Sequence, residues 1–67
     1  MQTLSHVIEA VAYDEGTRRL RDRYRDSGET VTYENVPQEL YDSLIFAQSI
    51  GGFFRDHIEG HFPLRRN

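Results

Sequence analysis

One segment, from Thr17 to Asp26, constrains the possible folds most strongly because it holds five of the eight basic residues of the chain. If the segment is a β-strand, successive side chains alternate between its two faces. One face then carries a row of arginines, and the other carries Leu20, Asp22 and Tyr24. If it is a helix instead, Leu20 and Tyr24 lie one turn apart, and Arg18 lies one turn from Asp22. The pattern within the segment fits both alternatives, so the flanking sequence has to decide between them.

The residues on both sides of this segment favour the strand. Residues 14–17 and 26–28 combine Asp and Gly with Thr or Ser, which is typical of tight turns. Residues 5–13 alternate in the manner of a strand, and residues 29–33 are rich in β-branched and aromatic side chains. A segment between two short turns and two strands is most simply a strand, so the sequence predicts a three-stranded antiparallel meander. The arginine ladder on its middle strand is then formed by Arg19, Arg21, Arg23 and Arg25.

The spacing of apolar residues changes in the second half of the chain. Pro37 suits the first turn of a helix, and apolar residues then recur at helical spacing, which predicts a helix over residues 37–48. The segment that ends in two glycines, residues 49–52, is expected to interrupt it. A shorter helix is predicted over residues 53–59, ending at Gly60. The remaining residues are expected to form an extended tail with a basic end.

The predicted fold is therefore a single α+β domain over residues 1–67. It consists of a three-stranded antiparallel β-meander packed against one helix and a second short C-terminal helix. A chain of 67 residues buries only a small core, so nearly all its large apolar residues are needed there. Core positions are predicted for Leu40, Phe46, Phe53 and Phe54, whereas Tyr33 is the aromatic residue expected to remain exposed.

The composition limits the class of protein. The chain has no cysteine, which excludes disulfides and thiolate metal sites and is consistent with a cytoplasmic location. No apolar stretch approaches the roughly 20 residues of a membrane span, and the N-terminus lacks the pattern of a signal peptide. Domains of this size that lack disulfides often gain stability by association. We therefore expect a homo-oligomer that makes no contact with a membrane.

Charge is segregated along the chain, although the formal net charge is only −3. Residues 18–25 carry five arginines and one acid, whereas residues 26–50 carry five acids and no base. All eight basic residues are arginines, whose planar fork binds phosphates and carboxylates at two points and stacks on rings. The local patches are therefore a better guide to partners than the net charge.

The order and spacing of several short motifs resemble the KTSC domain, a bacterial and phage module named for its occurrence at the C-terminus of some lysyl-tRNA synthetases. The matching positions are Ser5, Val11–Asp14, Leu20, Tyr24, Tyr33, Val36, Pro37, Tyr41, Leu44, Ser49, Gly51, Phe54, Ile58, Phe62 and Pro63. The positions that depart from the family pattern are Asp22, Val31, Arg55 and Glu59. RNA binding has been suggested for this family, so the resemblance implies the same fold and nucleic acid as a ligand.

The arginine ladder has two interpretations. Guanidinium groups at alternate positions of a strand lie about 7 Å apart, close to the phosphate spacing of an extended single strand, so the ladder could bind nucleic acid or a nucleotide. Alternatively, the arginines pair across strands with Glu9, Glu29 or Glu34 and leave a nearly neutral surface. On the opposite face, Asp22 is expected to pair with an arginine or to lie at a sheet edge rather than to act in catalysis.

The remaining patterns give weaker signals. Residues 49–52 could bring main-chain N–H groups to an anion at a helix N-terminus, or they could simply form a tight turn. His57 and His61 have the spacing of two metal ligands on one helix face, but Gly60 interrupts that helix, which favours surface histidines. The serines, histidines and acids have no spacing typical of a catalytic triad. No catalytic residue, metal or cofactor is therefore predicted.

These observations favour a small non-enzymatic module that binds RNA, another single-stranded nucleic acid or a nucleotide. The alternative is a protein-interaction or self-assembly module, in which the arginines meet the acids of a partner protein or of another copy. The residues expected to bind an anion, with the tyrosine stacking on a base, are Arg19, Arg21, Arg23, Arg25, Tyr33, Arg55, His57, Arg65 and Arg66.

Overall fold

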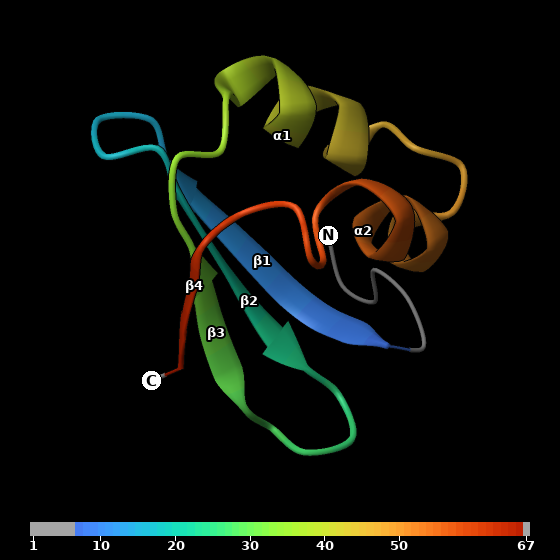
Figure 1. Ribbon diagram of the computed structural model, residues 1–67. Coiled ribbons are helices and arrows are strands. Elements are labelled where there is room, and N and C mark those ends of the chain that lie inside the picture. The colour runs from blue at the N-terminus through green and yellow to red at the C-terminus, as the bar shows by residue number, and fades with distance from the viewer. Residues whose placement is uncertain (1–6, 67) are drawn as a thin grey trace.

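Two helices cover one face of a four-stranded antiparallel sheet in a computed structural model that describes residues 7–66 (Figure 1). The elements in chain order are β1 (Ile8–Asp14), β2 (Arg19–Tyr24), β3 (Thr30–Tyr33), α1 (Gln38–Ile45), α2 (Ile50–His57) and β4 (Leu64–Arg66). The predicted α+β class is confirmed, but the sheet has one strand more than predicted. The expected start of the first strand at residues 5 and 6, and the end of the tail at Asn67, lie outside the described residues.

The first three strands form the predicted antiparallel meander. The arginine-rich segment is β2, so the strand alternative is confirmed and the helix alternative is wrong. β2 lies between β1 and β3, and the register aligns Asp22 with Val11 on one side and with Val31 on the other. The turn after β2 uses Gly28 at a φ of +70°, and the N–H of Gly28 donates to the carbonyl of Tyr24 at 2.9 Å.

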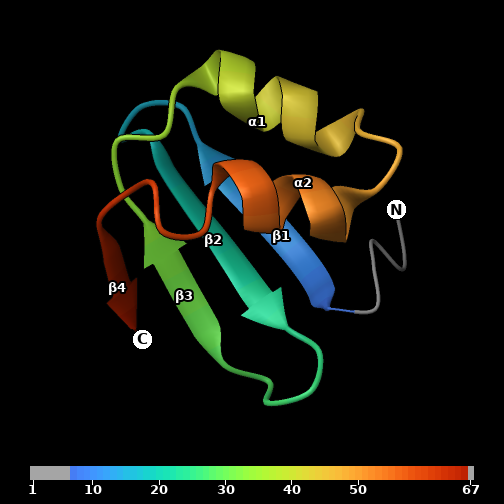
Figure 2. The same cartoon turned by 45° about the vertical axis from the view of Figure 1, so that its right-hand side comes forward.

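The predicted C-terminal tail forms the fourth strand of the sheet. β4 pairs antiparallel with β3 and places Arg65 opposite Thr32 (Figure 2). A main-chain hydrogen bond extends the pairing of the two strands, because the N–H of Glu34 donates to the carbonyl of Pro63 at 2.9 Å. A strand of three residues carries too little periodic pattern to be predicted from the sequence, because its pairing depends on residues some thirty positions away.

Both helices differ from the predicted ranges. α1 ends at Ile45 instead of residue 48. α2 begins at Ile50 instead of residue 53, because Ser49 is its N-cap and accepts a hydrogen bond from the N–H of Gly52 at 3.2 Å. The two glycines that were expected to end the first helix therefore belong to the first turn of α2. Among the described residues, no helix is long and apolar enough to cross a membrane.

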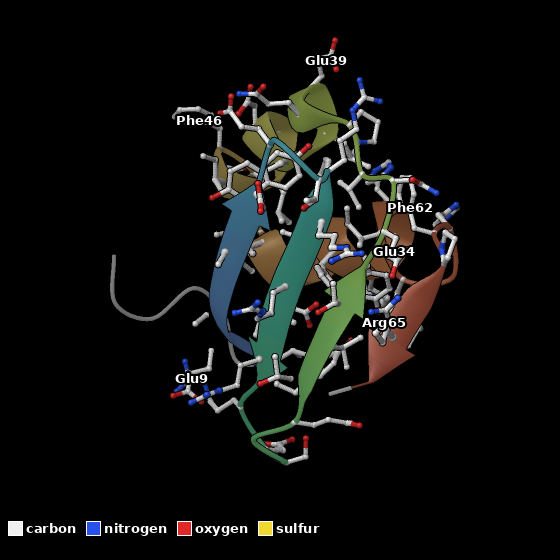
Figure 3. The ribbon with its side chains drawn as sticks, turned by 90° about the vertical axis from the view of Figure 1, so that its left-hand side faces the viewer. Glu9, Glu34, Glu39, Phe46, Phe62 and Arg65 are labelled. Carbon is white, nitrogen blue, oxygen red and sulfur yellow. The ribbon has the colours of Figure 1, made fainter. Side chains whose placement is uncertain are left out.

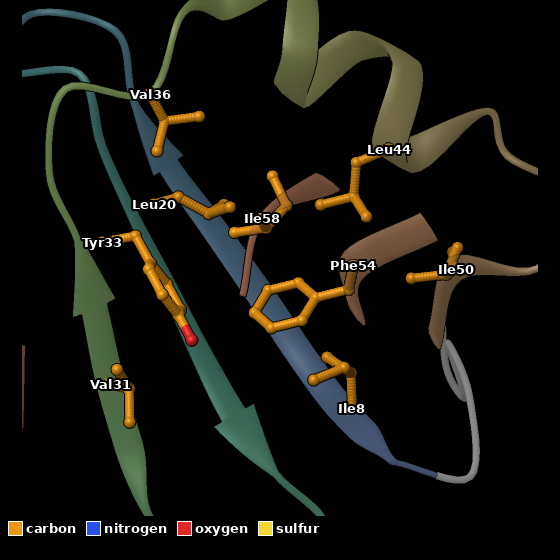
Figure 4. Packing of buried hydrophobic residues seen from close by; sticks show 9 residues of the cluster. All are labelled: Ile8, Leu20, Val31, Tyr33, Val36, Leu44, Ile50, Phe54 and Ile58. Atoms are coloured by element: carbon orange, nitrogen blue, oxygen red, sulfur yellow. The ribbon is translucent and has the colours of Figure 1, made fainter. Parts of the chain in front are cut away.

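Nine buried apolar side chains fill the space between the helices and the sheet (Figure 4). They are Ile8, Leu20, Val31, Tyr33, Val36, Leu44, Ile50, Phe54 and Ile58. The predicted core position is confirmed for Phe54, and Leu40 and Phe53 are partly buried against the same cluster. The prediction for Phe46 is wrong, because its side chain is 84% exposed. α1 ends immediately before Phe46, so helical spacing no longer turns this residue toward the sheet.

Candidate functional site

The arginines of β2 alternate with buried residues, so they lie on the sheet face that the helices leave open. We name this the outer face, and it is turned toward the viewer in Figure 3. Leu20 and Asp22 point toward the helices and are 0% and 1% exposed. The residues at the alternate positions of the strand are exposed, and we name them the outer arginines: Arg19, Arg21 and Arg23. Arg25, the fourth residue of the predicted ladder, lies in the turn after β2 and does not continue the strand.

No salt bridge joins the outer arginines to acids of the described part of the chain, although the register places Asp14 of β1 opposite Arg19. The predicted pairing with Glu9, Glu29 or Glu34 is therefore not found for Arg19, Arg21 or Arg23. Glu34 instead accepts from Arg65 of β4, with 2.9 Å between the carboxylate oxygen and the guanidinium nitrogen. The outer face therefore keeps three cationic groups in a row along β2.

Arg65 extends this row sideways across the sheet. The register aligns Ala12 with Arg21, Arg21 with Thr32 and Thr32 with Arg65, so these four side chains belong to one face of the sheet. A depression of about 440 Å³ lies between them, and its lining includes Arg19, Arg21, Thr32 and Arg65. The sequence predicts Arg65 as an anion-binding residue of the basic tail, and the fourth strand is what brings it beside the outer arginines.

A second and smaller depression continues along the same strand. It measures about 150 Å³, and its lining includes Ala10, Ala12, Arg21, Arg23 and Thr30. Because it shares Ala12 and Arg21 with the larger depression, the two hollows adjoin along β2. The side chains beside Arg21 and Arg23 on this face are small, whereas Asp14 lies opposite Arg19. An extended ligand can therefore lie against the guanidinium groups of Arg21 and Arg23 without meeting bulky neighbours.

The other predicted anion-binding residues are not part of this surface. Arg55 and His57 belong to α2 on the opposite side of the sheet, where Arg55 lies 3.5 Å from Asp56 and the His57 ring packs 4.4 Å from that of Phe53. The backbone of Arg66 belongs to β4, whereas its side chain lies outside the described part of the structure.

The expected exposure of Tyr33 is wrong. Tyr33 is 1% exposed, and its ring lies edge-on to that of Phe54 at 5.4 Å. The cause is the register, which pairs Tyr33 with the buried Leu20 and therefore turns both side chains toward the helices. Tyr33 is thus unable to stack on a base of a ligand at the outer face.

The prediction for Asp22 is also wrong, because this residue neither pairs with an arginine nor lies at a sheet edge. It is 1% exposed at the centre of the sheet, and neither carboxylate oxygen has a hydrogen-bond partner within the described residues. Burial, and then the nearby charge of Glu59, raise the pKa of Asp22 from 3.8 to about 7. The side chain is enclosed between the sheet and the helices, so it does not reach a ligand on the outer face.

Two tyrosine hydroxyls and a carboxylate lie on the same inner side of the sheet. The hydroxyl of Tyr24 donates to Glu59 at 3.1 Å and lies 3.3 Å from the hydroxyl of Tyr33. Burial, and then the hydrogen bond with Tyr33, raise the pKa of Tyr24 above its ordinary value. Tyr24 therefore stays neutral, and both tyrosines contribute packing and hydrogen bonds.

The weaker patterns are explained by local structure. An added Cβ at Gly52 would lie 3.0 Å from the Ser49 hydroxyl, so residues 49–52 form a tight capped turn in which a larger residue would crowd the cap. His57 is the last residue of α2, and the chain turns at Gly60 with a φ of +79°, so His61 is not on the same helix face. No group of three or more potential metal ligands occurs among the described residues.

Comparison with known proteins agrees with this architecture. The family model described as the KTSC domain matches residues 4–62. A protein of Tsukamurella paurometabola is 36% identical over 58 residues, which cover 87% of this chain and 85% of that protein. The crystal structure of a KTSC domain protein from Yersinia pestis superposes with a TM-score of 0.92 at 31% identity, covering 100% of this chain and 93% of the other. The resemblance inferred from the sequence motifs is therefore confirmed, and the chain belongs to the KTSC domain family.

Proposed function

We propose that this KTSC domain is a non-enzymatic module that binds single-stranded nucleic acid, RNA in the first instance, on the outer face of its sheet. The observation that carries the proposal is the row of outer arginines, which are exposed and form no salt bridge within residues 7–66. Uncompensated guanidinium groups attract polyanions and bind phosphate oxygens through two parallel hydrogen bonds. A cytoplasmic location, where RNA is abundant, belongs to the same proposal.

The geometry of the strand suits an extended chain of phosphates. Residues two apart on a strand are separated by about 7 Å, so the outer arginines present three regularly spaced cationic groups. Arg65 lies two strands away on the same face, and its salt bridge to Glu34 is surface-exposed on the arginine side, where such pairs contribute little. An incoming phosphate can therefore compete for this guanidinium.

The test compares a double variant of the outer arginines with a matched control. Arg21→Ala/Arg23→Ala should weaken binding of a fluorescein-labelled 20-nucleotide RNA in anisotropy titrations. Because each phosphate contact on a single strand contributes about 0.7 to the salt slope, the slope of log K against log salt should flatten by about 1.4. The control is Arg55→Ala, which removes an arginine from α2 on the other side of the sheet. Unchanged affinity and slope in the double variant would contradict the proposal.

Self-assembly is the second candidate, and one observation favours it. Three acids, Glu15, Glu39 and Asp42, line a depression of about 460 Å³ beside α1 together with Arg18. This acidic end could meet the arginine row of another copy, and the sheet has open edges at β1 and β4. Light scattering, with the 260/280 nm absorbance ratio measured on the same peak, separates the two candidates. A monomer that retains nucleic acid supports binding, whereas a nucleic-acid-free dimer or larger species supports assembly.

A further inference from the structure

The aromatic rings of the first three strands are turned away from the outer face. Tyr13 of β1 stacks on Tyr41 of α1 at 4.7 Å, and its hydroxyl donates to the carbonyl of Val36 at 2.6 Å. Tyr24 and Tyr33 both lie edge-on to Phe54 in the core. Proteins that bind single-stranded bases from a sheet usually stack them on aromatic side chains of that sheet. Here the tyrosines of β1, β2 and β3 pack against the helices on the other face of the sheet.

The side chains next to the outer arginines have little capacity to read bases. The register places Ala10, Ala12 and Asp14 of β1 on one side of them, and Thr30 and Thr32 of β3 on the other. Alanine makes no hydrogen bond through its side chain, and Thr32 is only 8% exposed. A ligand lying in the two adjoining depressions therefore meets small side chains and guanidinium groups, together with Asp14 at the Arg19 end. Only the guanidinium groups carry charge complementary to a nucleic acid.

We infer that the outer face recognises the phosphodiester backbone alone, so that its ligand class is any flexible single-stranded chain of regularly spaced phosphates, with or without bases. This inference rests on the proposed function and specifies which part of the nucleic acid is bound. Affinity then comes from phosphate contacts and counterion release, and it is independent of sequence. It predicts that bases point away from the sheet and remain accessible to solvent.

The size of the basic surface sets the footprint of the ligand. Arg19 and Arg23 are four residues apart on one strand, which corresponds to about 13 Å. Arg65 lies two strands from Arg21, which corresponds to about 10 Å in the perpendicular direction. The basic surface therefore accommodates four phosphates of the ligand, three along β2 and one near Arg65. Four contacts at about 0.7 each give an expected salt slope of about −3.

The deciding experiment compares a base-containing strand with the same strand without bases. Fluorescein-labelled 12-mers of deoxythymidine and of abasic tetrahydrofuran residues have the same number and spacing of phosphates. Anisotropy titrations with the full chain at 50 and 200 mM salt should give dissociation constants within threefold of each other and equal slopes. A tenfold or larger loss on the abasic strand overturns the inference but leaves the proposed function intact. Failure of both strands to bind overturns the inference, and failure of the 20-nucleotide RNA as well overturns the proposed function.

Substitutions distinguish phosphate contacts from stacking by the guanidinium planes. Lysine keeps the positive charge but lacks the flat face on which a base can stack. Arg21→Lys/Arg23→Lys should therefore keep the salt slope on both strands and retain equal affinity for them. Arg21→Ala/Arg23→Ala should weaken both strands by the same factor, and Arg55→Ala should weaken neither. If the alanine pair weakens only the thymidine strand, the arginines stack on bases and the inference is wrong.

Discussion

Replacing Asp22 with asparagine should remove most of the pH dependence of stability that this domain has between pH 4 and pH 8. In the folded state the pKa of Asp22 is raised from 3.8 to about 7, by burial and then by Glu59. At pH values between these two, the unfolded chain has released the proton while the folded chain still holds it. The unfolded state then binds fewer protons, so the free energy of unfolding falls as pH rises and reaches its lower plateau above pH 7.

The size of this effect follows from the shift in pKa. A change from 3.8 to about 7 is about three pKa units, and each unit corresponds to about 1.4 kcal/mol, so the full loss is about 4 kcal/mol. The core of a domain of this size rarely contributes more than about 3–5 kcal/mol to the free energy of unfolding, so ionisation of Asp22 removes most of that stability. Asparagine has the same shape and does not ionise, but its buried amide lacks partners, which costs about 1–3 kcal/mol. The variant should therefore be less stable than the wild type at pH 4 and more stable at pH 8.

The free energy of unfolding of the wild type and of Asp22→Asn is measured by urea unfolding at one-unit steps from pH 4 to pH 8. Far-ultraviolet circular dichroism monitors the unfolding and gives a curve against pH for each protein. Titrating groups that do not interact with Asp22 contribute equally to the two proteins and cancel in their difference. Asp26→Asn is the matched control, because Asp26 is an exposed aspartate in the turn after β2 and its replacement should leave the wild-type curve unchanged. If the Asp22→Asn curve runs parallel to the wild-type curve over this range, the buried carboxyl is not the source of the pH dependence.

Three further predictions follow from named contacts. Glu59→Gln removes the charge that helps to raise the pKa of Asp22, so the pH-dependent loss of stability should become smaller and end at a lower pH; an unchanged curve would show that the two acids do not interact. Phe54→Ala should cost about 3–5 kcal/mol in urea unfolding, whereas Phe46→Ala should cost less than about 0.5 kcal/mol because that side chain is 84% exposed. Equal costs for the two phenylalanines would contradict the assigned core. Ser49→Ala should cost about 1 kcal/mol through loss of the N-cap of α2, as measured by the same unfolding assay, and a cost near zero would mean that the cap is not formed in solution.

The parts of the fold that depend on neighbouring residues could be predicted from the sequence. The turn residues around β2, the alternation of its side chains and the start of α1 near Pro37 are all properties of short segments. The position of the outer arginines on one face follows from that alternation. The pairing of β4 and the place of Arg65 beside Arg21 could not be predicted, because they depend on a register between distant segments.

The wrong predictions for Asp22 and Tyr33 have one physical cause. Alternation divides a strand into two faces but does not say which face is buried. Asp22 lies on the same face as Leu20 and Tyr24, as the alternation of the strand predicts. The charge of Asp22 predicts an arginine partner or a place at a sheet edge, but the pairing with Val11 and Val31 puts this face under the helices. Tyr33 follows the same rule, because its partner across the strands is the buried Leu20.

This shared cause links the buried acid to the proposed binding surface. β2 is an inner strand of the sheet, and one of its faces packs against the core. That face carries the apolar residues of the strand and also contains Asp22. The acid is tolerated because its raised pKa lets it remain protonated below about pH 7. The opposite face is then free to carry a uniform row of cations, since the core places no demand on it. The two features can therefore be changed independently: Asp22→Asn should alter stability while leaving the affinity of the folded domain for phosphates unchanged, and the arginine substitutions should do the reverse.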